Sequence, residues 1–470
     1  MAGAVYVVRR SQGDTRSVEG PVRRASVGPP RTRRTRAKTI PDISMRRRIA
    51  ACCVILLSAS ADGFLSSDIG RHPHLDAYAI SVTSSQLHLA KTKAKKKKKK
   101  LGKTGGGGLK GFGGSKSSSV KSSDGVIDRS KSALKFYEYL SKNGAEANLK
   151  RVGLGYFPLK IDDDTTIQLR GVIALKDISK GDSIIEIPYE MALDLGRESA
   201  DPTLPATAFL QKYCAWRSGA DVPPGDKGRG DYFDMLPPFL SNDCLGSTDF
   251  FRDSALDMLQ SPMVKEETLE RKKLVKLRYE RDIESMSQMS SNLYQWDGEA
   301  ATEEHLQWAS WIITSRVLTV QGPPESSFSN RLLIPLIDMC NHSRESPHIL
   351  TGRAMPGGLL KVVAGVDVKA GDAIDICYGG GVEGNDRFVQ DYGFLDSSPE
   401  AYKIVAKKLL GKGRSIAKMT AAEQELELLS LEGTTLEEDE SLLANCSEID
   451  ERAALDYRIG IKNAIRRLRG

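Results

Sequence analysis

The pattern of hydrophobic and polar positions changes character near Asp128. Residues 130–143 (SKSALKFYEYLSKN) place apolar side chains at helical spacing behind a serine that can cap the first turn, which predicts an amphipathic helix. Short runs rich in β-branched residues then predict strands at 166–175, 183–188, 358–364 and 373–378. We therefore expect strands at both ends of this region.

Two of these strand regions mirror each other. Residues 177–187 (DISKGDSIIEI) and 367–377 (DVKAGDAIDIC) each begin with a turn and continue as a strand. The glycine in each turn can adopt a positive φ at little cost. We interpret the two segments as corners of one β-rich domain.

Helices are predicted between these strands and after them. The charged run 265–282 and the run 302–320 (TEEHLQWASWIITSRVLTV) form a helical middle, in which Thr302 caps the second helix and His305 lies on its surface. The tail predicts helices at 421–431, from about 434–439, and at 447–468, where basic residues crowd the end. Residues 401–433 leave room for little more than one helix and a linker.

The first 125 residues have the pattern of a leader. Three arginines precede the apolar stretch 49–60 (IAACCVILLSAS), which is far shorter than the roughly 20 residues that span a bilayer. We therefore expect a signal peptide at 45–63 and no membrane anchor. Residues 1–44, before Met45, are expected to be a gene-model extension or a disordered segment. Residues 64–125 predict a transit-like, disordered linker rich in Lys, Gly and Ser.

This arrangement resembles the bipartite leader of algae with secondary plastids, in which a transit peptide starts near a phenylalanine, here Phe64. The resemblance implies a plastid location. The secretory pathway and the cytoplasm are the alternatives.

Charge also separates the leader from the body of the chain. Of 470 residues, 1–125 hold 26 Lys and Arg against 7 Asp and Glu, whereas 126–470 hold 42 against 54. The formal charge of +7 therefore averages a basic leader with an acidic body, and the body is not expected to bind nucleic acid. The six-lysine run 95–100 fits a nuclear address or a nucleic-acid arm, but its low-complexity surroundings favour a solvated linker.

The candidate chemistry narrows to one loop. Seven cysteines without a C-x-x-C or C-x-C pair argue against a disulfide framework and a metal cluster, so no metal is expected. Residues 379–384 (GGGVEG) match a dinucleotide-binding pattern, but a second strand and its acidic residue are missing. In contrast, the apolar run 331–343 (RLLIPLIDMCNHS) ends in Asp338, Asn341 and His342. Such a cluster must be satisfied by local backbone or by a ligand.

Three motifs in order carry a family resemblance. IPLIDMCNHS at 334–343, AIDICYGG at 373–380 and DYGFLD at 391–396 resemble the SET-domain protein methyltransferases. They are most similar to the branch that contains Rubisco large-subunit methyltransferase and cytosolic relatives that methylate lysine or histidine. Matching segments at 169–188, 232–238 and 308–316, and in the tail, extend the resemblance over roughly 150–470. The N-H-S triplet is also a glycosylation sequon, but its apolar context argues against that use.

The resemblance implies an α+β fold. A β-rich SET domain of the β-clip type would occupy 126–400, with a pseudoknot and a helical insertion at about 200–320. A shortened helical substrate-binding domain would follow at 401–470. By position, the cofactor S-adenosylmethionine would be bound by Asn341 and His342, by backbone around Arg170, Gly171 and Val172, and by Arg316. Asp338 would support the loop, Tyr378 would be the catalytic tyrosine, and Tyr392 would line the substrate channel.

The implied activity is S-adenosylmethionine-dependent protein-lysine N-methyltransferase. Transfer in a narrow, dry channel depends on alignment, and desolvation lowers the pKa of the target lysine from its ordinary value of about 10.4. The chain lacks the cysteine-rich zinc-binding segment that often follows the SET core of histone-directed members, which favours a non-histone substrate. The resemblance suggests Rubisco large subunit or plastid aldolase as that substrate. The protein is expected to be a monomer. A catalytically inactive SET-fold binding or assembly module and a protein-histidine methyltransferase are the alternatives.

Overall fold

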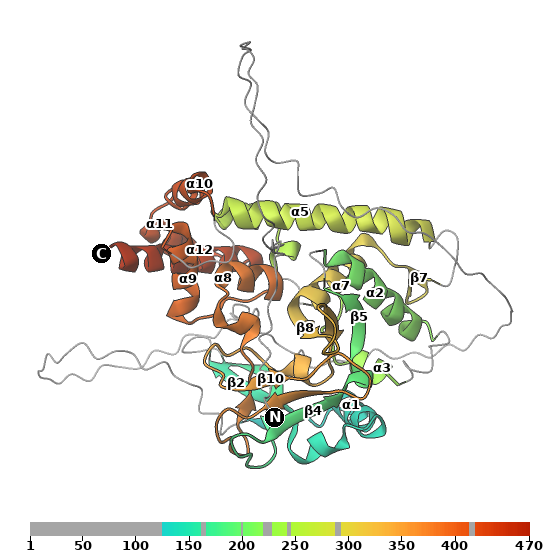
Figure 1. The fold of residues 1–470 in the computed structure, drawn as a ribbon. Coiled ribbons are helices and arrows are strands. Elements are labelled where there is room, and N and C mark those ends of the chain that lie inside the picture. Colours follow the sequence, from blue (N-terminus) through green and yellow to red (C-terminus); the bar gives the residue numbers. More distant parts are fainter. Residues whose placement is uncertain are drawn as a thin grey trace, which may run out of the picture. The chain divides into compact units, whose positions relative to one another are not determined.

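Antiparallel strands and helices make up the computed structural model, and the last elements of the chain are helices (Figure 1). The structure describes residues 125–160, 166–198, 201–219, 228–241, 246–286, 293–412 and 419–470. The predicted leader segments 1–44 and 45–63, and all but the last residue of 64–125, lie outside the described residues. Among the described residues, each helix is too short or too polar to cross a membrane. The predicted α+β class is confirmed.

The first sheet joins the two ends of the β-rich region. Its strand order is β1 (Val126–Ile127), β2 (Val152–Lys160), β3 (Thr166–Ala174) and β12 (Ala373–Ile374), with antiparallel neighbours. Strand β3 lies where it is predicted. Strand β12 is shorter than the predicted strand 373–378, because the chain turns into the 3₁₀ helix η8 (Tyr378–Gly381), in which Gly379 and Gly380 have φ of +59° and +62°.

Two three-stranded sheets and a two-stranded sheet of β6 (Gln295–Trp296) and β7 (Glu299–Ala300) follow among the described residues. One three-stranded sheet has the order β10 (Ile349–Thr351), β11 (Leu359–Val363) and β4 (Ser183–Pro188), so the predicted strands at 358–364 and 183–188 are neighbours. The other has the order β5 (Leu193–Arg197), β9 (Ser329–Leu333) and β8 (Leu318–Gln321). Their buried faces contribute to one hydrophobic core that also receives α1 (Lys131–Lys142), whose N-terminus is capped by Ser130 as predicted.

The mirrored turns meet each other, which confirms their interpretation as corners of one domain. Ile178 and Val368 form an antiparallel bridge with two backbone hydrogen bonds of 2.9 Å. Gly181 and Gly371 have φ of +90° and +92°, values that favour glycine because it has no Cβ.

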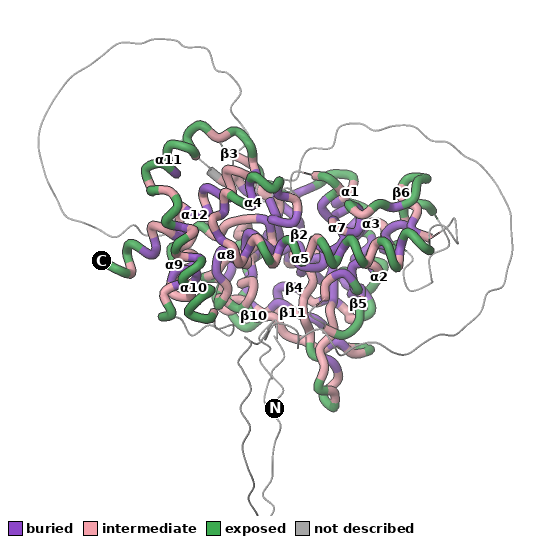
Figure 2. Tube along the Cα trace, turned by 90° about the horizontal axis from the view of Figure 1, so that it is seen from above, coloured by how far each residue is buried: buried purple, intermediate pink, exposed green. Residues whose placement is uncertain are grey.

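The helical middle is partly as predicted. Helices α2 (Thr203–Arg217), α5 (Pro262–Arg278) and α7 (Glu303–Arg316) pack against one another, and α5 also contacts α10 (Ala421–Leu431) (Figure 1). Along α5, buried, intermediate and exposed residues alternate (Figure 2).

Two predictions for the run 302–320 are wrong. The helix ends at Arg316, and residues 318–321 form β8, because their β-branched side chains favour an extended chain that can pair with β9. His305 is buried rather than on the surface: its ring stacks on Phe239 with 4.0 Å between centroids, and its Nδ1 accepts a hydrogen bond from the Thr302 N–H.

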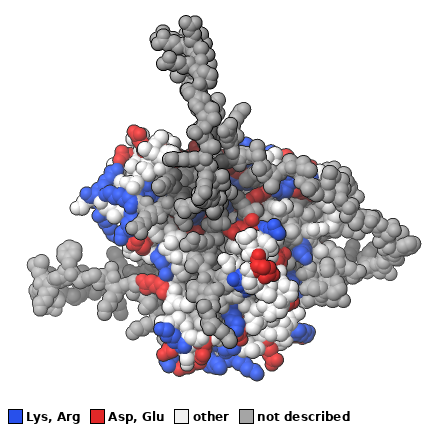
Figure 3. All heavy atoms as spheres, in the orientation of Figure 1, with Lys and Arg blue, Asp and Glu red and all other residues white. Residues whose placement is uncertain are grey.

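The tail forms more helix than the sequence indicates. Residues 401–433 contain most of α9 (Pro399–Leu409) and all of α10, and α11 (Leu436–Asn445) and α12 (Ile449–Arg469) follow. The core of this group includes Leu409, Tyr457 and Ile461, and it also takes in Phe251 and Val264 from the helical middle. Arginines crowd the last turn of α12, where basic atoms gather near the C-terminus in Figure 3. This sign of charge suits the negative end of the helix dipole.

Candidate active site

The predicted loop and tyrosine segments lie side by side. His342 and Ile376 form a parallel bridge, in which the Ile376 N–H donates to the Asn341 carbonyl at 2.9 Å and the Ser343 N–H donates to the Ile376 carbonyl at 3.1 Å. Backbone hydrogen bonds therefore fix the loop after the 3₁₀ helix η7 (Ile337–Met339) against the chain that follows β12.

Tyr378 is tied to this loop at both ends. Its hydroxyl donates to the Cys340 carbonyl at 2.6 Å, and its backbone N–H donates to His342 Nδ1 at 3.1 Å. Its ring stacks on that of Tyr392, with 5.0 Å between centroids and 28° between planes. Burial raises the pKa of the Tyr378 hydroxyl well above its ordinary value, so near neutral pH the group is a hydrogen-bond donor rather than a base.

Asn341 explains why β3 carries a glycine. Its side-chain amide donates to the Arg170 carbonyl at 3.0 Å, and it lies so close to β3 that a Cβ on Gly171 would be 2.5 Å from Nδ2. Gly171 therefore permits a close approach that any other residue would block. Val172 points into the core, and the guanidinium of Arg170 donates to the Met235 carbonyl at 2.6 Å, so the backbone of these two residues is what β3 presents to the Asn341 amide.

Arg316 and Asp338 form a second cluster. Arg316 donates a hydrogen bond to the backbone carbonyl of Asp338 at 3.0 Å, and it forms an ion pair of 3.8 Å with the side-chain oxygen Oδ2 of Asp338. That Oδ2 accepts a hydrogen bond of 2.9 Å from the Tyr232 hydroxyl. Asp338 Oδ1 is buried and has no hydrogen-bond partner among the described residues. Burial raises the pKa of Asp338 to about 6, although Arg316 opposes the shift.

His342 is held by residues that the motifs did not identify. Its Nε2 lies 3.5 Å from Oδ2 of Asp396, and the same oxygen accepts a hydrogen bond of 2.9 Å from Arg344. Arg344 also donates to the carbonyls of Gly381 and Glu383, at 2.7 and 2.8 Å, and so fixes the glycine-rich loop. Burial alone would raise the pKa of Asp396, but the neighbouring His342 ring and hydrogen bonds from Arg344 and Ser398 hold it well below its ordinary value.

The signal for this cluster was weak in the sequence. Arg344 directly follows the N-H-S triplet, and Asp396 ends the DYGFLD motif. Nothing in their spacing indicates that they meet, because the contact depends on how the two loops fold together.

A pocket opens beside Tyr378. Its volume is about 660 Å³, with open solvent at its mouth included. Four of the predicted site residues line it, namely Arg316, Asp338, Tyr378 and Tyr392. The other residues that line it are Thr314, Ser315, Val317, Leu318, Thr319, Ile337, Cys340, Leu350, Ile376, Cys377, Gly379 and Glu383.

The remaining predicted residues do not line this pocket. They are Arg170, Gly171, Val172, Asn341 and His342, of which Asn341 bonds to the Arg170 carbonyl and His342 Nδ1 accepts from the Tyr378 N–H. The structure thus brings the predicted residues together as two groups that share Tyr378. Among the described residues there is no cluster of His, Cys, Asp and Glu that could hold a metal ion, and the four described cysteines are free.

A comparison with curated proteins finds a relative in the group of methyltransferases that the motifs resemble. No family model matches the chain. A curated relative from Pisum sativum, ribulose-1,5 bisphosphate carboxylase/oxygenase large subunit N-methyltransferase, chloroplastic, is 24% identical over 246 residues. The match covers 48% of this chain and 45% of the relative, so the chain spans about half the length of the curated relative it matches.

Solved structures give a further, distant likeness. The SET domain of LSMT bound to MeLysine and AdoHcy is 18% identical with a TM-score of 0.49, and it covers 73% of this chain and 91% of that chain. Rubisco LSMT bound to AdoMet is 17% identical with a TM-score of 0.47, and it covers 72% of this chain and 91% of that chain. The chain is therefore similar in sequence to a Rubisco large-subunit methyltransferase, as its motifs predict.

Proposed function

We propose that this chain is an S-adenosylmethionine-dependent protein-lysine N-methyltransferase. The observation that carries the proposal is the pairing of the His342 loop with the Tyr378 segment beside a pocket. A loop and a tyrosine far apart in sequence are held together by backbone hydrogen bonds, so their geometry is rigid. The similarity to a named N-methyltransferase supports the same reaction class.

The residues present fit the proposed cofactor. Arg316 offers a guanidinium for a carboxylate, and its side chain is 16% exposed. Asp338 offers a buried carboxylate oxygen without a hydrogen-bond partner among the described residues, which suits a cationic ligand. We propose that Asn341, His342, Arg316 and the backbone of residues 170–172 hold the cofactor. When bound, S-adenosylmethionine supplies an activated methyl group.

The protein's own residues would orient and desolvate the target amine. The rings of Tyr378 and Tyr392 and the side chains of Ile337 and Leu350 line the pocket, so a lysine that enters it loses water and more readily releases its proton. The Tyr378 hydroxyl already donates its proton to the Cys340 carbonyl, which leaves its oxygen lone pairs to accept a hydrogen bond from the amine. In this proposal Tyr378 positions the amine and does not act as a base.

We further propose that the substrate is a non-histone protein of the plastid. The signal-peptide and transit-like pattern in residues 45–125 supports a plastid address. The curated relative is named as chloroplastic and as acting on the Rubisco large subunit. Soluble plastid proteins are therefore the first substrates to test.

The test uses the full chain, tritiated S-adenosylmethionine and a soluble plastid extract. We expect a labelled protein band with the wild type, and a loss of about 100-fold with Tyr378→Phe, because the amine loses an orienting partner. Tyr189→Phe is the matched control: the Tyr189 hydroxyl also makes a 2.6 Å hydrogen bond, to Asp194, and Tyr189 does not line the pocket. This control should retain wild-type activity within about twofold.

Three results would contradict the proposal. Equal labelling by wild type, Tyr378→Phe and Asn341→Ala would show that the paired segments do not perform the transfer. Label on histidine instead of lysine, located by mass spectrometry of the product, would identify a histidine methyltransferase. Absence of transfer together with absence of cofactor binding in calorimetry would favour the inactive binding module.

A further inference from the structure

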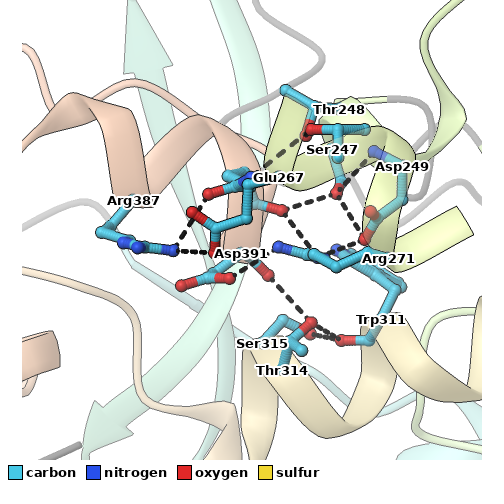
Figure 4. Close-up of polar contacts among 12 residues, drawn as sticks. Ser247, Thr248, Asp249, Glu267, Arg271, Trp311, Thr314, Ser315, Arg387 and Asp391 are labelled. Atoms are coloured by element: carbon cyan, nitrogen blue, oxygen red, sulfur yellow. Dashed lines mark hydrogen bonds and ion pairs between the residues drawn. The ribbon is translucent and has the colours of Figure 1, made fainter. Parts of the chain in front are cut away.

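A buried arginine from the helical middle reaches the segment that carries Tyr392. Arg271 of α5 pairs with Asp249 and, at 2.9 Å, with Asp391, and it also donates to the Gln390 carbonyl at 3.2 Å (Figure 4). Its side chain is 12% exposed, and those of both aspartates are 2% exposed. Three elements therefore meet at one guanidinium: α5, the 3₁₀ helix η5 (Thr248–Phe250) and the π-helical turn η9 (Phe388–Tyr392).

The turn η9 is held at several of its backbone carbonyls. The Ser247 hydroxyl donates to the Gln390 carbonyl at 2.9 Å, and the Thr314 hydroxyl of α7 lies 3.4 Å from the Asp391 carbonyl. Immediately after the turn, Gly393 has φ of +83°, and a Cβ there would be 2.9 Å from the Ser247 backbone nitrogen. Arg271 and its neighbours thus fix the backbone on both sides of Tyr392, and Figure 4 shows Arg271 between Asp249 and Asp391.

Tyr392 occupies the place where this constraint matters for the pocket. Its ring lines the pocket and stacks on Tyr378 with 5.0 Å between centroids. A shift of Asp391 would be passed directly to the next residue, and so to the ring that stacks on Tyr378. Misplacement of about 1 Å in such a site can reduce a rate by about 100-fold.

The ion pairs of Arg271 with Asp249 and Asp391 are not expected to add much to the stability of the folded protein. A buried arginine between two aspartates is often no more stabilising than apolar residues of the same size, because three charged groups must lose their water. What the guanidinium adds is a planar fork that fixes the direction of several acceptors at once. Arg271 supplies that fork to η5 and η9 together.

We propose that Arg271 is a positioning residue, which sets the stacking of Tyr392 on Tyr378 through Asp391. This inference rests on the proposed function where it concerns methyl transfer. It assigns a role in the site to the inserted helix α5, whose contacts with the pocket are indirect.

The test compares two arginines on the same helix. Arg278 is a matched control because it also pairs with two carboxylates, Asp201 and Asp282, both at 2.7 Å, and its side chain is 14% exposed. These partners lie away from η9. We expect Arg271→Met to lower the initial rate of methyl transfer into plastid extract by about 10- to 100-fold at saturating cofactor, and Arg278→Met to change it less than about threefold. The KM for S-adenosylmethionine should stay within about twofold in both.

A second readout does not require activity. With 3-fluorotyrosine introduced in place of Tyr392, the ¹⁹F signal reports the ring stack on Tyr378. We expect Arg271→Met to shift and broaden this signal and Arg278→Met to leave it unchanged. If Arg271→Met does not fold, Asp391→Asn keeps the side-chain size while it removes the ion pair, and it should give the same shift.

The outcomes separate this inference from the proposed function. An unchanged ¹⁹F signal in Arg271→Met, or in Asp391→Asn where that variant is the one used, overturns the positioning role. So does an equal loss of rate in Arg271→Met and Arg278→Met. If the wild type transfers no methyl group, the proposed function fails, and the ¹⁹F comparison still decides whether Arg271 sets the ring stack.

Discussion

Replacing Gly171 by alanine tests the central contact of the site. The new Cβ would lie 2.5 Å from Asn341 Nδ2, a separation that non-bonded heavy atoms do not tolerate, so the Asn341 side chain must move. If Asn341 moves freely, the cost is the loss of its hydrogen bond to the Arg170 carbonyl, about 1 kcal/mol, and if its surroundings resist the move, overpacking raises the cost to about 3 kcal/mol. We therefore expect Gly171→Ala to lower the free energy of unfolding by about 1–3 kcal/mol.

The control is a glycine that is required for a different reason. Gly181 has φ of +90° and no neighbour within 4 Å of a built Cβ, so Gly181→Ala should cost about 1–2 kcal/mol of backbone strain alone. Urea unfolding measures both free energies. Calorimetry with S-adenosylhomocysteine should show weaker binding for Gly171→Ala and unchanged binding for Gly181→Ala, because Gly181 lies in a turn away from the loop.

A double-mutant cycle identifies the clash as the cause. Asn341→Ala removes the atom that the new Cβ would strike, so Gly171→Ala should cost much less in the Asn341→Ala background than in the wild type. A coupling free energy of about 1–3 kcal/mol is expected between the two positions. If the two changes are additive, or if Gly171→Ala is as stable as the wild type, the close-approach argument is refuted.

Three further predictions concern pH and buried charge. The pKa of Asp338 is about 6 in the folded protein, above its unfolded value of about 3.9, so its ionisation costs the folded state up to about 3 kcal/mol as the pH rises from 4 to 6. In urea unfolding, the free energy of unfolding of Asp338→Asn should therefore rise relative to that of the wild type over this pH range. The Asp439 carboxylate accepts hydrogen bonds from Arg458 and Lys462, which lower its pKa although burial opposes the shift. Asp439→Asn should therefore lower the free energy of unfolding by about 3–5 kcal/mol at pH 7. If the difference from the wild type did not shrink below about pH 4, the charge of Asp439 would not be its cause. Burial lowers the pKa of His305 to about 4, so stability should fall as pH drops from 6.5 to 4, and an NMR titration midpoint near 6.5 would refute its burial.

Local signals in the sequence located many of the elements. The serine cap before α1 and the β-branched run of β4 act over a few residues, so their boundaries follow from nearby chemistry. Elements whose state depends on a distant partner were less predictable. Residues 318–321 have apolar spacing that suits a helix, but they form a strand because β9 is available to pair with them.

The candidate site divides in the same way. The end of the apolar run by itself indicated Asp338, Asn341 and His342, because polar groups at such a place need partners, whereas Tyr378 followed from the family resemblance. Only the tertiary structure decided what those partners are: the Cys340 carbonyl for Tyr378, Asp396 with Arg344 for His342, and Arg271 for the turn that carries Tyr392. Side-chain hydrogen bonds and ion pairs act over a few ångströms in space, and residues far apart along the chain come that close only when loops from different sheets and helices fold together.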